Sequence, residues 1–460
     1  NYFAIQNLSA SKTQRLQEGW REQTQSLFAS AELGYKNTYF LTLTGRNDWA
    51  SQLANSSTSS FFYPSVGLSG VISEMIQMPS FIDYMKVRGS FSSVGMPYPR
   101  NLTSPTYEYN EATQSWKPKT HYPIGDLKPE RTDSWEVGLD MKLFKDFNLG
   151  LSWYLANTFN QTFDPQISVS SGYTTIYLQT GYVRNTGLEL SLGYGHTWNN
   201  NFRWDSNFTL SHNKNKIKEL VRDYVHPETG ELINKDRLDV GGLGKARFIL
   251  KEGGTLGDLY TQSDLKRDDN GMVDIDPTGI VAIENNLPDI KLGSVFPKAN
   301  LAWSNHFSWK GISLSALFTA RIGGIVYSAT EAAMDQYGVS ERSALARDNG
   351  GVLVNNRTLV DAQNYYTTIG SESGLPQYYT YNATNVRLQE ASIGYLIPRK
   401  WLGNVCDIQV SVIGRNLWMI YNKAPFDPES VATTDNYYQG IDYFMLPSTR
   451  NIGFNVKINF

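Results

Sequence analysis

The stretch NIGFNVKINF, residues 451–460, alternates apolar and polar side chains up to its last residue. A period of two places every second side chain on the same face of a β-strand. One face carries Gly453, Asn455, Lys457 and Asn459, and the apolar face carries Ile452, Phe454, Val456, Ile458 and Phe460. The stretch therefore predicts a strand whose apolar face meets an apolar environment.

The same alternation recurs along most of the chain and predicts about thirteen strands. Many are longer than the usual five or six residues of a soluble strand, and they match the roughly 9–11 residues of a tilted membrane-spanning strand. The predicted strands are 25–35, 38–48, 61–74, 83–95, 131–144, 147–158, 182–196, 202–214, 295–308, 312–323, 385–397, 406–421 and 446–460.

Short and long connections between these segments alternate. The short or intermediate connections are 36–37, 75–82, 145–146, 197–201, 309–311 and 398–405, and the long ones are 49–60, 96–130, 159–181, 215–294, 324–384 and 422–445. Outer-membrane barrels have short periplasmic turns and long extracellular loops. The pattern therefore predicts an all-β fold, namely an antiparallel transmembrane β-barrel with long extracellular loops.

Composition agrees with this fold and limits the partners. Aromatic residues make up 13% of the 460 residues, and there are 38 Gly, a mixture that favours strands and turns. The net charge of −3, without a dense basic run, argues against a nucleic-acid partner. The mean hydropathy of −0.39 fits a membrane barrel, because each of its strands is only half apolar. Cys406 is the only cysteine, so no internal disulfide can form.

Two other protein classes fit parts of the pattern. A soluble glycan-binding all-β protein also alternates, but it gives no reason for loops sorted by length. A passive porin shares the loop pattern and usually has about 16–18 strands.

The polar faces of the strands are the expected lining of a wet lumen. There they would hydrate a transport path and tune its charge selectivity. The candidates by alternation are Lys86, Arg88, Glu136, Asp140, Glu189, Arg203, Asp205 and Arg321.

The long loops are rich in Tyr, Trp, Asn and Asp, which suit sugar or peptide ligands as well as loop packing. The candidate ligand contacts are Tyr365, Tyr366, Tyr437, Tyr438 and Tyr443. The acids Asp427, Glu429, Asp435 and Asp442 are expected to be solvated loop residues.

No pattern indicates catalysis, a metal or a cofactor. The stretch DLKRDDNGMVDID (264–276) looks like a calcium loop, but with Gly271 at the sixth position its first and twelfth positions are Lys266 and Pro277. A β-turn with positive φ at Asn270-Gly271 is the interpretation that remains.

Several stretches together resemble the C-terminal part of SusC-like (RagA-like) TonB-dependent transporters, nutrient importers of the Bacteroidota outer membrane. Their order and spacing cover nearly the whole chain. They are LKPERTDSWEVGLDMKLF (127–144), VRNTGLELSL (183–192), NVRLQEASIGYLIP (385–398), VIGRNLWMIYNKAPFDPES (412–430) and LPSTRNIGFNVKINF (446–460). A terminal Phe after such alternation also resembles the sorting signal of outer-membrane barrels.

The resemblance implies a barrel of about 22 strands with an N-terminal plug domain and a TonB box. It also implies a SusD-like surface lipoprotein as a lid, and oligosaccharide or peptide substrates. No plug, TonB box or signal peptide is recognised in residues 1–460. We therefore expect this chain to supply about 13–14 strands of the barrel in the outer membrane, with a periplasmic C-terminus. The plug and the N-terminal strands are expected to come from another segment.

Overall fold

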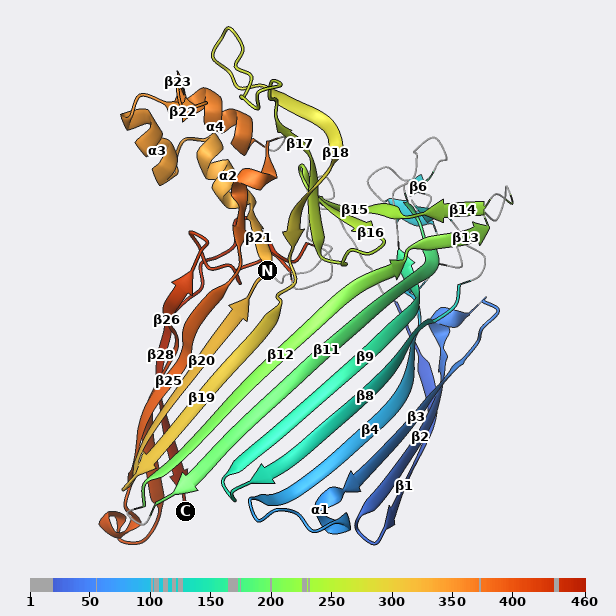
Figure 1. Ribbon diagram of the computed structural model, residues 1–460, viewed down its shortest axis with the longest axis vertical. Coiled ribbons are helices and arrows are strands. Elements are labelled where there is room, and N and C mark those ends of the chain that lie inside the picture. The colour runs from blue at the N-terminus through green and yellow to red at the C-terminus, as the bar shows by residue number, and fades with distance from the viewer. Residues whose placement is uncertain are drawn as a thin grey trace, which may run out of the picture.

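A computed structural model describes residues 20–54, 56–100, 102, 107–110, 115–117, 121–122, 127–163, 173, 175–176, 177–198, 201–225, 230, 232–371, 374–433 and 438–460. Its main feature is a 13-stranded sheet in which neighbours along the chain pair antiparallel (Figure 1). In sheet order the strands are β1 (Thr24–Tyr35), β2 (Tyr39–Ala50), β3 (Phe61–Val71), β4 (Ile82–Met96), β8 (Glu130–Leu143), β9 (Phe147–Phe163), β11 (Leu178–Thr197), β12 (Arg203–Glu219), β19 (Ala299–Trp309), β20 (Ile312–Ile322), β25 (Asn385–Ile397), β26 (Asp407–Asn422) and β28 (Asn451–Asn459). Each predicted strand is found, so the all-β antiparallel prediction is confirmed.

Several predicted strand ends are wrong by three to five residues, including those of β9 and β12, which run on to Phe163 and Glu219. The third strand stops at Val71, where the chain turns into the short helix α1 (Ile72–Met75). The last strand begins at Asn451 instead of residue 446, because Pro447 has no N–H to donate to a ladder. Asn451 is the first residue of β28 that pairs with β26.

The tight turns use residues that tolerate a left-handed backbone. Lys36 and Asn37, between β1 and β2, have φ of 54° and 53°. Lys310 and Gly311, between β19 and β20, have φ of 49° and 88°. Positive φ at both central positions matches the right-handed twist of the strands, so these hairpins hold their register.

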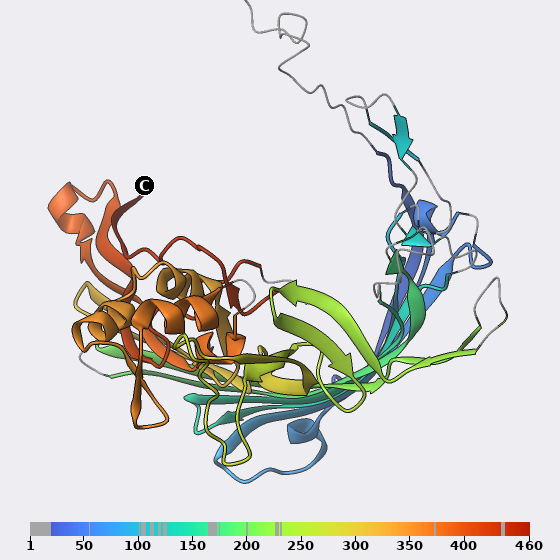
Figure 2. The ribbon, with the colours of Figure 1, turned by 90° about the horizontal axis from the view of Figure 1, so that it is seen from above.

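The sheet is curved into an open trough, and its two edge strands do not meet (Figure 2). β1 and β28 each pair with one neighbour only within the described part of the chain, and every residue of both strands is exposed. The result is a partial barrel, as predicted.

The convex face of the trough carries large apolar side chains such as Leu68, Trp135 and Leu314. Near the short turns it carries a belt of aromatic rings. Neighbouring rings in this belt have centroids 4.7–6.4 Å apart and come from Phe81, Phe144, Phe147, Tyr194, Trp204 and Phe307. Aromatic girdles of this kind lie where the hydrocarbon of a membrane meets its headgroups.

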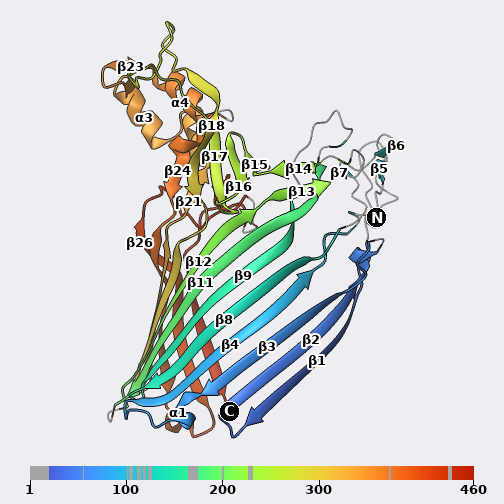
Figure 3. The same ribbon diagram turned by 45° about the vertical axis from the view of Figure 1, so that its right-hand side comes forward.

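The long connections fold into structure of their own above the trough (Figure 3). We call the part made of 237–294, 325–382 and 438–442 the upper lobe. It contains a sheet of β15 (Arg237–Leu243), β16 (Ala246–Lys251), β17 (Asp258–Leu265) and β18 (Ile283–Ser294), and the helices α2 (Ala329–Gln336), α3 (Glu341–Asp348) and α4 (Ala362–Gly370). Its short strands are β21 (Ile325–Ser328), β22 (Val352–Val354), β23 (Thr358–Val360), β24 (Thr380–Asn382) and β27 (Ile441–Asp442).

A single hydrophobic core joins the three connections of the upper lobe. Phe248, Tyr379 and Ile441 come from different connections, and each is at most 2% exposed. The sequence pattern had predicted only loops here. Elsewhere the remaining short strands are β5 (Glu108–Asn110), β6 (Ser115–Lys117), β7 (His121–Tyr122), β10 (Thr175–Ile176), β13 (Val221–Val225) and β14 (Leu232–Lys235).

The predicted turn at Asn270-Gly271 is confirmed. Gly271 has φ of 77°, and the Asp268 carboxylate accepts backbone N–H groups of Asn270 and Met272. No group of three or more His, Cys, Asp or Glu side chains suited to a metal occurs among the residues placed by the structure. No helix in the described ranges is long and apolar enough to cross a membrane.

Candidate functional site: the concave wall

Strand register brings the eight predicted lumen residues to one face of the sheet, opposite to the apolar residues. Lys86 lies beside Asp140, and Glu189 lies beside Ser152. Arg321 lies beside Asn300, and Asp205 lies beside Gly195. We call this face the concave wall. Helix α1 lies on the other side of the sheet (Figure 2). Gly70 faces this helix, because a Cβ there would lie 2.6 Å from Met75 Cε.

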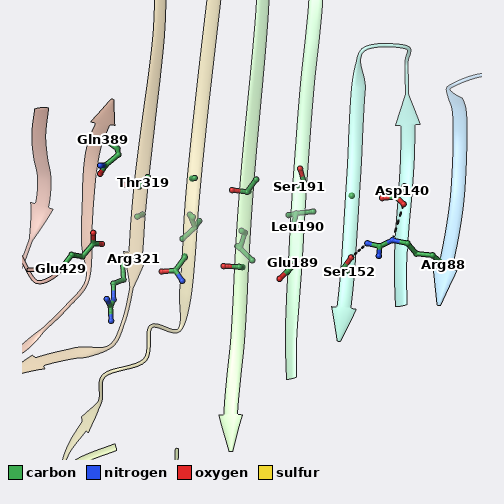
Figure 4. A pocket seen from close by; sticks show the side chains of 18 residues that line it. Arg88, Asp140, Ser152, Glu189, Leu190, Ser191, Thr319, Arg321, Gln389 and Glu429 are labelled. Atoms are coloured by element: carbon green, nitrogen blue, oxygen red, sulfur yellow. Dashed lines mark hydrogen bonds and ion pairs between the residues drawn. The ribbon is translucent and has the colours of Figure 1, made fainter. Parts of the chain in front are cut away.

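Arg88 is the centre of a polar cluster on the concave wall. Its Nη1 donates to Glu136 Oε1 at 2.5 Å. Its Nη2 donates to Ser152 Oγ at 2.5 Å, and its Nε lies 3.5 Å from Asp140 Oδ2 (Figure 4). Charge-assisted contacts from three nitrogens of one guanidinium, each to a different residue, fix its direction. Arg88 therefore lies flat along the wall, and its charge is balanced by the two carboxylates.

Gly138 makes this arrangement possible. A Cβ at Gly138 would stand 2.5 Å from Arg88 Nε and 2.9 Å from Arg88 Cγ. The glycine thus leaves the space across which the arginine reaches from β4 to β9.

A cavity of about 710 Å³ opens on the concave wall between Arg88 and Arg321 (Figure 4). Its floor is made of small side chains that are successive register partners on five strands, and these are Gly150, Ser191, Thr209, Ala302 and Thr319. Four of the predicted lumen residues line it, and these are Arg88, Asp140, Glu189 and Arg321. The small floor residues and the charged residues beside them, with Glu189 on the middle strand β11, give a hollow with both signs of charge.

The other four predicted lumen residues share the face but do not line this cavity. Glu136 pairs with Arg88. Lys86 places its ammonium 5.8 Å from the centre of the Phe40 ring. Arg203 and Asp205 pair with each other at 2.6 Å near the short turns.

The opposite end of the cavity holds Arg321. Its Nη2 donates to the backbone oxygen of Val295 at 2.7 Å, and its buried Nε has no hydrogen-bond partner among the described residues. Glu429, from the connection between β26 and β28, also lines the cavity. The connection therefore reaches from the rim into the trough.

Arg387 holds that connection in place. Its guanidinium is 2.8 Å from Asp427 Oδ1 and 3.3 Å from Glu429 Oε2, and only 5% of its side chain is exposed. Alternation alone gave no sign of this role, because a bulge near Arg387 interrupts the register of β25.

The expectation that the loop acids are simply solvated is wrong for two of them. The side chain of Asp427 is 10% exposed. Burial opposes its ionisation, but hydrogen bonds from Arg387 and from the Glu429 N–H outweigh burial and lower the pKa of Asp427. Asp442 is buried and accepts a hydrogen bond from Ser328 Oγ at 2.5 Å. Asp435 lies outside the described residues.

The candidate tyrosines are dispersed. Tyr365 and Tyr366 are neighbours on α4, and Tyr366 packs in the core of the upper lobe, so it supports the fold of that lobe. Burial raises the pKa of Tyr365 to about 12. Tyr438 and Tyr443 are exposed, and Tyr437 lies outside the described residues. Direct ligand contact by these tyrosines stays a prediction.

Comparisons with known proteins identify the family. The family model for TonB dependent receptor-like β-barrels matches residues 1–417. TonB-dependent receptors P3 and P26 of Formosa agariphila are each 24% identical to this chain over 99% and 95% of its length. The matches cover 48% and 46% of those proteins, so the chain spans about half the length of these curated relatives.

Solved structures share the fold. The RagAB peptide importer matches in its "open-open" and "closed-closed" states with TM-scores of 0.72 and 0.73. Each match has 18% identity and covers 99% of this chain and 50% of the other. The family consists of outer-membrane receptors and transporters rather than enzymes. The strand order, the apolar convex face and the family match agree, and the chain belongs to the TonB-dependent receptor-like β-barrel family.

Proposed function

We propose that this chain forms the C-terminal part of the barrel of an importer that carries oligosaccharides or peptides across the outer membrane with energy supplied through TonB. The observation that carries the proposal is the charged concave wall beneath a folded upper lobe. An importer of polar nutrients needs a hydrated path and a structured binding region at its entrance. The convex apolar face with its aromatic belt disfavours a soluble glycan-binding protein.

The open edges support a larger barrel. A strand edge left unpaired in lipid is costly, because each backbone N–H and C=O would lack a partner. We infer that β1 and β28 pair with strands from the N-terminal part of the same transporter. In this arrangement the plug domain of that part fills the trough, and the C-terminus faces the periplasm together with the short turns.

The upper lobe offers a surface for a SusD-like lipoprotein lid. Leu353 of β22 and Leu359 of β23 are direct cross-strand partners, and both are more than half exposed. Tyr337, Val339 and Leu345 of the same connection are also more than half exposed. The segment from α2 to β23 that carries them lies beyond the barrel strands, at the end of the molecule opposite to α1 and the short turns (Figure 1). Lipid therefore does not cover it. Exposed apolar groups outside the membrane favour a protein partner.

Energised uptake tests the function. Cells that carry the full-length transporter should accumulate a labelled oligopeptide or oligosaccharide pool, and collapse of the proton-motive force should abolish this uptake. Uptake that continues without the proton-motive force would identify a passive porin and contradict the proposal.

The lid is tested separately. Replacing both Leu353 and Leu359 by Ser should reduce recovery of the co-expressed lipoprotein with the tagged transporter. Leu232→Ser, on the exposed hairpin of β13 and β14, is the matched control. Equal recovery with both variants would exclude the β22–β23 hairpin as the docking surface.

A further inference from the structure

The convex face has a second hollow, distinct from the cavity on the concave wall. It lies near the short turns, between strands β1–β4 and helix α1, and its volume is about 670 Å³. Its lining is strongly apolar and includes Leu33, Tyr35, Leu68, Val87 and Val137. A volume in this range holds a small organic ligand.

Two glycines create this convex groove. Gly89 lies in register between Leu68 and Val137 on the convex face. A Cβ at Gly89 would meet only the Glu136 backbone oxygen, at 3.8 Å, so the missing side chain leaves open space. At Gly70 the Met75 side chain of α1 occupies the space that a side chain would take, because Met75 Cε lies 2.6 Å from the position of a Cβ. Helix α1 therefore folds over the convex face and forms one wall of the groove.

The turn end of the groove is polar. Tyr35 and Tyr39 line the groove, and their ring centroids are 6.5 Å apart. Lys36, in the turn between them, places its Nζ 5.3 Å from the centre of the Tyr35 ring. No carboxylate lies within ion-pair distance of Lys36 in the part of the chain that the structure describes. The apolar groove thus ends at an aromatic pair and an unpaired cation.

We propose that this groove binds one acyl chain of a phospholipid, whose phosphate contacts Lys36. The convex face meets hydrocarbon, so the groove is open to acyl chains and closed to polar solutes. Tyrosine and lysine at the end of an apolar surface suit the headgroup level of a bilayer, and an ammonium pairs well with a phosphate oxygen. That the bound lipid belongs to the periplasmic leaflet rests on the orientation of the barrel given under the proposed function. The presence of the groove does not depend on that orientation.

A photoreactive lipid tests the proposal directly. The full-length transporter is placed in nanodiscs that contain phosphatidylethanolamine with a diazirine on one acyl chain. After illumination, labelled peptides are mapped by mass spectrometry. Labelling is expected to concentrate on the end of β3 and on α1, and phosphatidylethanolamine is expected to remain bound through detergent purification.

Gly89→Leu should fill the groove and abolish the concentrated labelling. Ala391→Leu is the control, since Ala391 lies on the convex face of β25, on the far side of the sheet. Lys36→Gln changes only an exposed turn, and it should reduce lipid retention even if Gly89→Leu fails to fold. Uptake that depends on the proton-motive force is measured with the same variants, so that a loss of import is distinguished from a loss of lipid binding.

The outcomes separate a bound lipid from other occupants. Uniform labelling around the convex face, unchanged by Gly89→Leu and Lys36→Gln, would mean ordinary bilayer contact and would overturn the proposal. A groove protected from the lipid probe and crosslinked to another polypeptide would also overturn it, because the occupant would be protein.

Discussion

Arg387 of β25 and Asp427 of the last long connection form a buried ion pair, with 2.8 Å between Nη2 and Oδ1. The pair joins the wall of the trough to a loop at its rim. Removing one partner of a buried pair typically costs about 3–5 kcal/mol. Here Glu429, 3.3 Å from Arg387, compensates part of the charge that the loss of Asp427 would leave.

We therefore expect Asp427→Ala to release the 423–450 connection. Protease cleavage within this connection should become faster, because its main anchor to the wall is lost. Replacing Arg387 by Met as well should restore part of the protection, since no unpaired charge then remains. Arg415→Ala is the control, because Arg415 of β26 and Glu390 of β25 form an exposed pair that does not involve the connection. Such pairs contribute about 1 kcal/mol or less, so comparable effects of Asp427→Ala and Arg415→Ala would contradict this interpretation.

Gly138 gives a second prediction. Gly138→Ala should displace Arg88 from Glu136 and Ser152, because the new Cβ would stand 2.5 Å from Arg88 Nε. Overpacking of this kind costs about 1–3 kcal/mol. The midpoint temperature of barrel unfolding in detergent should fall. Gly150→Ala should leave that temperature nearly unchanged, since its Cβ would have ordinary contacts of 3.7 Å with Asp140 and Ser191.

Tyr379 tests the packing of the upper lobe. Its hydroxyl donates to the buried Asp335 Oδ2 at 2.9 Å, and the same carboxylate pairs with Arg342 at 2.6 Å. Tyr379→Phe should cost about 1–3 kcal/mol, because the carboxylate loses one donor. Amide hydrogen exchange in α2 should become roughly tenfold faster for each 1.4 kcal/mol lost. Tyr337→Phe is the control, since Tyr337 is 75% exposed; equal exchange in both variants would exclude this role for Tyr379.

Asp289 predicts a pH dependence of the β15–β18 sheet. Hydrogen bonds from Arg237 and then from Lys251 outweigh burial and lower the pKa of Asp289. A lowered folded-state pKa adds stability above the ordinary aspartate pKa of about 4, and this stability is lost as the pH falls below that value. Pepsin should therefore cleave the sheet progressively faster below about pH 4.

In Asp289→Asn the sheet should be less stable at neutral pH, and its cleavage should depend less on pH. Asp268→Asn, in the exposed turn, should behave as the unchanged protein does. A pH profile that is unchanged in Asp289→Asn would contradict the assignment.

Much of the barrel wall could be predicted from the two-residue period of the sequence. A strand with one face in lipid repeats every two residues, so Trp135, Val137 and Leu139 revealed both the strand and its apolar side. The same rule placed Arg88, Glu136 and Asp140 together on the other face, and the register agrees. Strand ends were less certain where α1 and Pro447 interrupt the period.

The sequence by itself determined the strand order, the two faces of the wall and the family, because these depend on a period of two and on motif order. Only the tertiary structure decided what the long connections do. Phe248, Tyr379 and Ile441 meet in one core although they lie far apart along the chain, and no local period encodes such a contact. The same holds for Arg387 with Asp427, and for the groove at Gly89, since each depends on neighbours that only the folded sheet brings together.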